Sequence, residues 1–134
     1  MILVVEDHPD TMMFICRFLK RNGFRTQCAT GGKQALDLLR TLTPQLIILD
    51  LRMPDMDGLG VLRTLNDQPL LKKIPVIIYS TEHEKTLVEK ALRLGAKAYL
   101  VKGVVGMPEL LEAVCHHAQP EADFPGNNPA MAAM

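Results

Sequence analysis

The chain has 134 residues, a common length for one domain and long enough to enclose a hydrophobic core. Hydrophobic residues make up 48% and charged residues 22%, which is typical of a soluble globular protein, and no apolar run approaches membrane-spanning length. Fifteen basic residues balance fifteen acidic ones, which argues against direct binding to nucleic acid or to an anionic membrane.

Three cysteines, Cys16, Cys28 and Cys115, are widely spaced and set among apolar residues. An odd number in this setting indicates reduced packing residues of a cytosolic protein, and neither a disulfide framework nor a metal site. The first residues lack the basic start of a signal peptide, and acidic residues follow at once. We therefore expect a cytoplasmic protein with no membrane-spanning segment.

The first apolar run, Ile2 to Val5, predicts a strand that ends at Glu6 and Asp7. Pro9 fits the first turn of a helix, and Asn22-Gly23 would close that helix. The apolar stripe expected for the helix consists of Phe14, Phe18 and Leu19. Strand, turn and helix therefore follow one another directly, with two acids at the turn.

The residues from Arg25 to Ala29 alternate enough to predict a second, more exposed strand. A second helix, stopped by Pro44, is predicted from apolar residues at helical spacing, which are Ala35, Leu38, Leu39 and Leu42. The four apolar residues from Leu46 to Leu49 are too few for a helix and fit a strand buried on both faces. That strand ends at Asp50, where open α/β sheets place their ligands.

Pro54 and Asp57-Gly58 predict a turn after Asp50, before a helix from about Leu59 to Asn66. The remaining predicted elements are a strand at Pro75 to Tyr79, a helix marked by Leu87, Ala91 and Leu94, a strand at Ala98 to Val101 and a last helix beginning near Pro108. Five strands alternating with five helices predict an α/β fold, with a parallel sheet covered on both faces. Residues 119–134 are rich in Pro, Gly and Asn, so we expect a folded domain over 1–118 and then a disordered tail or linker.

Four of the five predicted strands end in residues with usable chemistry. These residues are Glu6 with Asp7, Asp50, Ser80 with Thr81, and Lys102. They would meet, because the carboxyl ends of parallel strands share one edge of the sheet. Crowded carboxylates raise one another's pKa unless a cation joins them, and Mg²⁺ suits oxygen ligands. A phosphoryl group on Asp50 would then fit beside Lys102, because aspartate is a known phosphoryl nucleophile.

Four segments, in this order, resemble the receiver domains of two-component response regulators, including the chemotaxis regulators. The segments are Val4-Val-Glu-Asp7, Leu49-Asp-Leu-Arg-Met-Pro-Asp-Met-Asp-Gly58, Pro75-Val-Ile-Ile-Tyr-Ser80 and Gly95-Ala-Lys-Ala-Tyr-Leu-Val-Lys102. The resemblance covers about residues 1–118. It implies a flavodoxin-like fold with strand order 2-1-3-4-5, and a signalling switch that is not an enzyme.

The resemblance also implies a role for individual residues. Asp50 would accept a phosphoryl group from a histidine kinase or a histidine phosphotransfer protein. The implied Mg²⁺ ligands are Glu6, Asp7, Asp50 and the backbone carbonyl of Arg52. The implied phosphate-binding and switch residues are Ser80, Lys102 and Tyr99. Tyr99 would move inward and repack the face formed by the fourth helix, the fifth strand and the last helix, which an effector domain or output protein of unknown kind would recognise.

Two departures from the receiver pattern lie near the end of the domain. Gly103 follows Lys102 where receivers usually have a proline, often after a cis peptide bond. Cis bonds without proline are costly, so we expect a trans bond or a looser loop here. Residues 95–98 lack the acidic pair common in transcription-factor receivers, which argues against a dimer built on those charges and favours a monomer or a weak dimer.

Three other interpretations deserve comparison. A pseudo-receiver would bind partners without being phosphorylated, and Gly103 leaves that possibility open. Asp55-Met-Asp57-Gly58 resembles the Asp-x-Asp-Gly signature of haloacid-dehalogenase-type phosphatases, but that signature should follow a strand directly, and Leu51 to Pro54 intervene. A calcium-binding EF-hand at 55–58 lacks the flanking helix and the glutamate at position 12.

Overall fold

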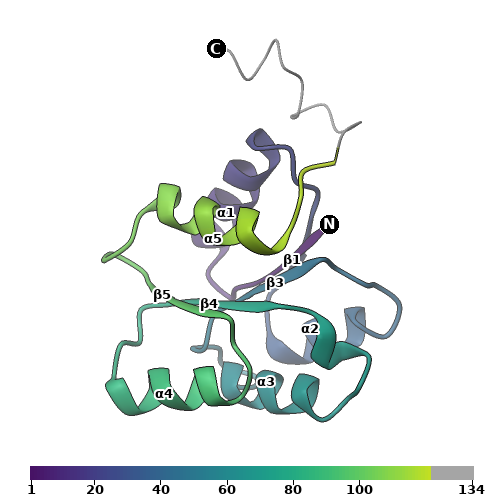
Figure 1. Ribbon diagram of the computed structural model, residues 1–134, viewed down its shortest axis with the longest axis vertical. Helices are drawn as coiled ribbons and strands as arrows, with labels where there is room; N and C mark the ends of the chain where they lie inside the picture. Colours follow the sequence, from purple (N-terminus) through teal and green to yellow (C-terminus); the bar gives the residue numbers. More distant parts are fainter. Residues whose placement is uncertain (122–134) are drawn as a thin grey trace.

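The computed structural model describes residues 1–121. Five parallel strands form one sheet in the order β2-β1-β3-β4-β5, with helices on both faces (Figure 1). The predicted α/β class and strand order are confirmed. The elements are β1 (Ile2–Val5), α1 (Pro9–Arg21), β2 (Thr26–Ala29), α2 (Gly32–Leu38), β3 (Leu46–Leu49), α3 (Gly58–Asn66), the 3₁₀ helix η1 (Leu71–Lys73), β4 (Val76–Ser80), α4 (Lys85–Arg93), β5 (Ala98–Val101) and α5 (Met107–His117).

The helices form two layers around the sheet. α1 and α5 lie together on one face, and α2, α3 and α4 cover the other (Figure 1). Side chains alternate between these layers along a strand. In β1, Ile2 and Val4 pack in the α1/α5 layer, whereas Leu3 and Val5 pack in the opposite layer. All residues of the central strands β1 and β3 are buried, as the apolar run Leu46–Leu49 predicts.

α1 begins two residues after Asp7, and hydrogen bonds define both of its ends. The His8 Nδ1 accepts a hydrogen bond from the Thr11 N–H at 3.3 Å and caps the helix. Pro9 occupies the first turn, as predicted. Asn22 and Gly23 end the helix, and Gly23 has a φ of 89°, which favours glycine.

Two details of the predicted helices are wrong. Phe14 is 60% exposed and does not belong to the buried stripe, because it precedes Ile15 and so points about 100° away from it. The buried side of α1 consists of Met12, Ile15, Cys16 and Leu19. The second helix ends at Leu38 and not at Leu42, since its last turn tightens: the Arg40 N–H donates to the Asp37 carbonyl three residues back.

The chain after α5 returns along the domain. The Gln119 N–H donates to the Gln45 Oε1 at 3.1 Å, and the Glu121 N–H donates to the Gly23 carbonyl at 3.0 Å. The Glu121 carboxylate forms an ion pair with Arg25. Residues 119–121 of the predicted tail therefore contact the domain, and 122–134 lie outside the described residues. Between residues 1 and 121, no helix is both long and apolar enough to cross a membrane.

Candidate functional site

The carboxylates of Glu6, Asp7 and Asp50 come together at the carboxyl edge of the sheet. β1 and β3 pair with Val5 opposite Leu49, so the residues that follow them leave the sheet side by side. The Asp50 N–H donates to the Val5 carbonyl at 3.0 Å and extends this pairing. One carboxylate oxygen of each acid lies within 4.8 Å of the others. Glu6 and Asp50 are deeply buried, at 2% and 5% exposure.

Lys102 brings a positive charge into this group of acids. It follows β5, and its N–H donates to the Ser80 carbonyl at 2.9 Å, so β4 and β5 end at the same edge. The lysine Nζ donates to the Glu6 Oε2 at 2.7 Å and lies 3.3 Å from the Asp50 Oδ2. Lys102 therefore bridges the two buried carboxylates, and this contact joins segments almost a hundred residues apart.

The lysine does not fully compensate the negative charges. Burial raises the pKa of Glu6, the hydrogen bond from Lys102 lowers it, and the charge of Asp50 raises it, with a net increase above the ordinary value. Burial alone would lower the pKa of Lys102. The hydrogen bond to Glu6 and the charge of Asp50 outweigh that effect and raise it. A further cation would relieve the remaining repulsion between the carboxylates.

The three acids fit a hard divalent cation. Each offers carboxylate oxygens, which are the ligands that Mg²⁺ takes in proteins. Three negative charges against the one lysine leave the pocket two charges short of neutrality when all groups are ionised. Within residues 1–121, no other group of three or more His, Cys, Asp or Glu side chains comes close enough to hold one ion.

Arg52, whose backbone carbonyl the receiver resemblance assigns to the metal, lies two residues after Asp50. Its N–H donates to the Asp50 Oδ1 at 3.2 Å and holds that carboxylate at the start of the loop. The exposed side chain forms an ion pair with Glu82, at 3.1 Å between Nε and Oε1. The sequence reasoning missed this link between the loops after β3 and β4. Arg52 lies two positions after Asp50, and Glu82 lies two positions after Ser80; their opposite charges at equivalent positions could have indicated this ion pair.

Ser80 and Tyr99 meet the same loop. Ser80 is fully buried at the end of β4, and its Oγ accepts the Glu82 N–H at 3.2 Å. The half-buried Tyr99 donates from its hydroxyl to the Glu82 carbonyl at 2.7 Å. Burial and then the charges of Glu82 and Asp50 raise the pKa of Tyr99. Because β3 and β4 are neighbouring parallel strands, Ser80 and Asp50 end at the same edge of the sheet.

The loop between β3 and α3 is held by its own acidic residues. The Asp55 carboxylate accepts the N–H groups of Gly32 and Lys33, at 3.1 and 3.0 Å, and so binds the start of α2. The hydrogen bond from the Lys33 N–H is the largest of the effects that lower the pKa of Asp55. Asp57 caps α3 by accepting the Gly60 N–H at 2.7 Å. Both carboxylates therefore hold the loop in place, which argues against the phosphatase interpretation of this segment.

Gly58 allows α3 to start directly against the end of β3. Its N–H donates to the Leu51 carbonyl at 2.9 Å. A Cβ at this position would lie 2.6 Å from the Asp50 carbonyl oxygen and from the Leu51 Cα, so a side chain would displace the backbone. The turn that Asp57-Gly58 predicts is thus required by the close approach of α3 to Asp50.

The loop between β4 and α4, residues 81–84, is more open. Thr81, His83 and Glu84 are exposed. Glu84 precedes α4 but supplies no side-chain hydrogen bond to its first turn. The contacts of Glu82 with Arg52 and Tyr99 are therefore the main side-chain links of this loop to the rest of the described chain.

The segment after Lys102 follows the expectation for a chain without proline at position 103. No peptide bond among the described residues is cis. Gly103 has a φ of 82°, and Lys102 pairs with Val105 in a short bridge beyond β5. Lys102 reaches the acids in this conformation, so Gly103 does not move the amine out of the site.

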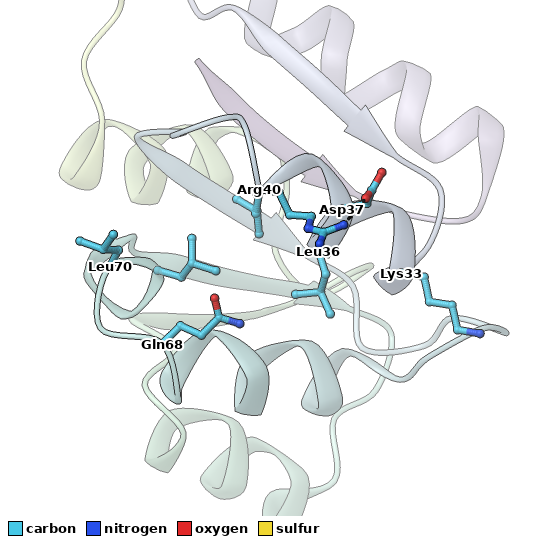
Figure 2. A pocket seen from close by; sticks show the side chains of 8 residues that line it. Lys33, Leu36, Asp37, Arg40, Gln68 and Leu70 are labelled. Carbon is cyan, nitrogen blue, oxygen red and sulfur yellow. Dashed lines mark ion pairs between the residues drawn. The ribbon is translucent and has the colours of Figure 1, made fainter.

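A separate surface hollow of about 590 Å³ lies between α2 and the segment before β4 (Figure 2). Leu36 and Leu70 lie on its sides, and Leu70 is 80% exposed. Lys33 and Arg40 contribute basic groups, although Arg40 lies 3.6 Å from Asp37 in an exposed ion pair. None of the acids at the sheet edge lines this hollow, so the candidate site rests on the carboxylates and Lys102.

Comparison with known proteins agrees with the fold and with the group of acids. The response regulator receiver domain family matches residues 2–115. The two-component response regulator ORR11 of Oryza sativa subsp. indica is 36% identical over 104 residues, covering 77% of this chain and 71% of ORR11. The regulatory protein AtoC of Escherichia coli is 33% identical over 101 residues, and the match spans 75% of this chain but only 22% of AtoC.

A solved structure supports the same assignment. The signal receiver domain of a signal transduction histidine kinase from Syntrophus aciditrophicus superimposes with a TM-score of 0.79, at 33% identity, covering 86% of each chain. The chain belongs to the response regulator receiver domain family. It is a receiver domain of two-component signalling with an acidic pocket at the carboxyl edge of its sheet.

Proposed function

We propose that this receiver is a phosphoryl-accepting switch of a cytoplasmic phosphorelay, with Asp50 as the acceptor. The observation that carries the proposal is the position of Asp50, which lies buried between two further carboxylates and the Nζ of Lys102. Its donor would be a phosphohistidine of a histidine kinase or of a histidine phosphotransfer protein. The receiver domain would extend over residues 1–118.

Glu6, Asp7, Asp50 and the Arg52 backbone carbonyl would hold Mg²⁺. The fit rests on the oxygen donors and on the uncompensated negative charge described above. When bound, Mg²⁺ supplies positive charge that neutralises the acids and the incoming phosphoryl oxygens. The chain itself contributes the arrangement of the ligands, which β1 and β3 deliver from adjacent strands.

The remaining residues would orient and neutralise the transferred group. A carboxylate oxygen of Asp50 forms the new P–O bond while the P–N bond to the donor imidazole breaks, and the released nitrogen takes up a proton. Lys102, already 3.3 Å from the Asp50 Oδ2, would pair with the phosphoryl oxygens. The Ser80 hydroxyl would donate a hydrogen bond to them, because β4 brings it to the same edge of the sheet.

Phosphorylation of Asp50 would change the rest of the domain through Tyr99 and the loop after β4. If Ser80 turns toward the phosphoryl group, its hydrogen bond to the Glu82 N–H at 3.2 Å is disturbed, and Tyr99 contacts the same residue. The face of α4, β5 and α5 would then repack and present a changed surface to an effector domain or output protein. This is a stoichiometric switch without multiple turnover, acting as a monomer or weak dimer.

The test is to incubate the chain with Mg²⁺ and acetyl phosphate and to measure its intact mass. We expect a gain of one phosphoryl group per chain, which does not form when excess EDTA is present from the start and does not form on Asp50→Asn. Asp57→Asn, which retains a capping residue at α3, is the matched control and should still be modified. A mass gain that survives Asp50→Asn contradicts the proposal.

A second measurement separates the alternatives. Beryllofluoride with Mg²⁺ should change the hydrogen exchange of the loop after β4 if the site binds a phosphoryl-like group. If the chain is not modified and beryllofluoride has no effect, it is a pseudo-receiver. Continuous release of phosphate from an added phosphate ester, at many turnovers per chain, would instead identify a phosphatase.

A further inference from the structure

Cys16 of α1 and Cys28 of β2 contact each other between the helix layer and the sheet. Their Sγ atoms lie 3.0 Å apart in a thiol–thiol hydrogen bond. Cys16 is buried, and Cys28 is half-buried on a strand at the edge of the sheet. A disulfide has a sulfur–sulfur length of about 2.05 Å, so closing the gap takes a movement of about 1 Å shared by two side chains.

We propose that Cys16 and Cys28 are a modification site, at which a hydroperoxide oxidises the two thiols to an intramolecular disulfide. The proposal does not depend on the function of Asp50. Within the described part of the chain, the remaining cysteine is Cys115, which is exposed on α5 and not buried beside another thiol. The chain thus carries two neighbouring thiols, one buried and one half-buried, that can react with each other, and a separate exposed thiol at Cys115.

Exposure decides which sulfur reacts first. Cys28 is the more accessible of the pair, so its thiolate attacks the terminal oxygen of the peroxide. The O–O bond breaks, Cys28 becomes a sulfenic acid, and the rest of the peroxide leaves as water or an alcohol. The Cys16 sulfur then attacks the Cys28 sulfur. The S–S bond forms, the S–O bond breaks, and the hydroxyl leaves as water with the Cys16 proton.

The environment of Cys16 suits the thiol that attacks the sulfenic acid of Cys28. Burial, and then the hydrogen bond with Cys28, raise the pKa of the Cys16 thiol to about 12. It therefore stays protonated at neutral pH and reacts poorly with an oxidant from solution. Its position at 3.0 Å from Cys28 instead allows it to capture the sulfenic acid before further oxidation.

The bond would connect two elements that meet by packing. It would join the middle of α1 to β2, which among the described strands pairs with β1 alone. The two residues are 12 positions apart, so the disulfide would close a short loop and restrict the unfolded chain. α1 starts directly after the acids of the candidate site, so oxidation would also fix the helix that follows them.

The experiment treats the reduced full chain with hydrogen peroxide, unfolds it, and alkylates the remaining thiols before intact-mass and peptide analysis. We expect most chains to yield a peptide that links Cys16 to Cys28 with the loss of two hydrogen atoms, whereas the exposed Cys115 stays outside this link, as a free thiol or as a reversible sulfenic acid. A reducing agent should restore all three thiols. Cys115→Ser, which leaves Cys16 and Cys28 intact, should give the same linked peptide and no free thiol.

Cys28→Ser and Cys16→Ala provide the matched single variants. Neither should lose the two hydrogens, and Cys16→Ala should accumulate sulfenic or sulfinic acid at Cys28, because the capturing thiol is absent. Full alkylation of both thiols after peroxide treatment of folded Cys115→Ser would overturn the proposal. Links between Cys115 and either member of the pair, in place of the expected peptide, would also overturn it.

Discussion

Replacing Glu6 by Gln should stabilise the metal-free chain, because it removes a buried negative charge that lies beside Asp50. Glu6 is 2% exposed, and its pKa is raised above the ordinary 4.5, first by burial and also by the charge of Asp50. A raised pKa means that folding disfavours the charged form of this carboxyl group. Glutamine is neutral, nearly equal in shape, and keeps an oxygen that can accept the hydrogen bond from Lys102.

The size of the effect follows from three contributions. The Lys102 Nζ lies 2.7 Å from Glu6, an attraction of about 6 kcal/mol at an effective dielectric constant of about 20. Asp50 lies within 4.8 Å and opposes it with a repulsion of about 3.5 kcal/mol. Desolvation of a buried carboxylate costs about 4 kcal/mol, the lower part of the usual range. The balance favours Gln by about 1.5 kcal/mol, or about 6 °C in melting temperature.

The assay is urea unfolding followed by circular dichroism, in EDTA, at several pH values. Below the folded pKa of Glu6 the wild-type carboxyl group is protonated and also neutral. The advantage of Glu6→Gln should therefore be present at about pH 7 and shrink as the pH falls through that folded pKa, above 4.5. Glu112→Gln, the same change at an exposed position on α5, is the control and should have little effect.

Two results would refute the reasoning. A variant less stable than wild type at neutral pH would mean that the Lys102 attraction outweighs burial and repulsion. A stability difference that is independent of pH would mean that the charge of Glu6 is not its cause. If Glu6 is a Mg²⁺ ligand, as proposed above, excess Mg²⁺ should reverse the order, because binding stabilises the wild-type chain by mass action and the variant lacks that ligand.

Three further results are expected from the same unfolding measurements. Lys102→Met leaves the two buried carboxylates without their bridge and should lower the free energy of unfolding by about 3 kcal/mol at neutral pH; an unchanged value would show that the bridge does not stabilise the fold. Gly58→Ala should cost at least about 2 kcal/mol because its Cβ meets backbone, whereas Gly60→Ala, whose Cβ meets only flexible side chains in a helix, should be neutral or stabilising by about 0.5 kcal/mol. Peroxide-treated chain joined through Cys16 and Cys28 should be more stable than reduced chain by up to about 3 kcal/mol, and no gain would indicate a strained disulfide.

The sequence predicted the edge of the sheet well because strand pairing controls it. Leu46 to Leu49 could be recognised as a buried strand, and pairing in register with β1 then places Asp50 beside Glu6 without any knowledge of side chains. Asn22-Gly23 and Asp57-Gly58 also marked their turns, because Gly23 takes a positive φ and Gly58 leaves room for the backbone beside it. Local and periodic signals thus predicted the strands and helices, whereas the strand order 2-1-3-4-5, which makes β1 and β3 neighbours, came from the resemblance to receiver domains.

Contacts between separate loops could not be predicted in this way. The Arg52–Glu82 ion pair depends on the direction in which two loops leave the sheet, and either charge alone looks like a solvated side chain. The approach of Cys16 to Cys28 depends on the rotation of α1 about its axis, and the exposure of Phe14 shows that the apolar pattern gave this rotation imperfectly. The 3.0 Å separation is a result of packing that spacing along the chain does not encode.

The hydrogen bonds from the start of α2 to Asp55 hold one of the two loops beside Asp50 more firmly than the other. The loop after β3 is held to α2 by Asp55 and to α3 by Asp57, which caps that helix. On the other side, Thr81, His83 and Glu84 are exposed, and this loop leads into a helix without a side-chain cap. We therefore expect a change of charge at Asp50 to alter amide exchange more in residues 81–84 than in residues 51–58.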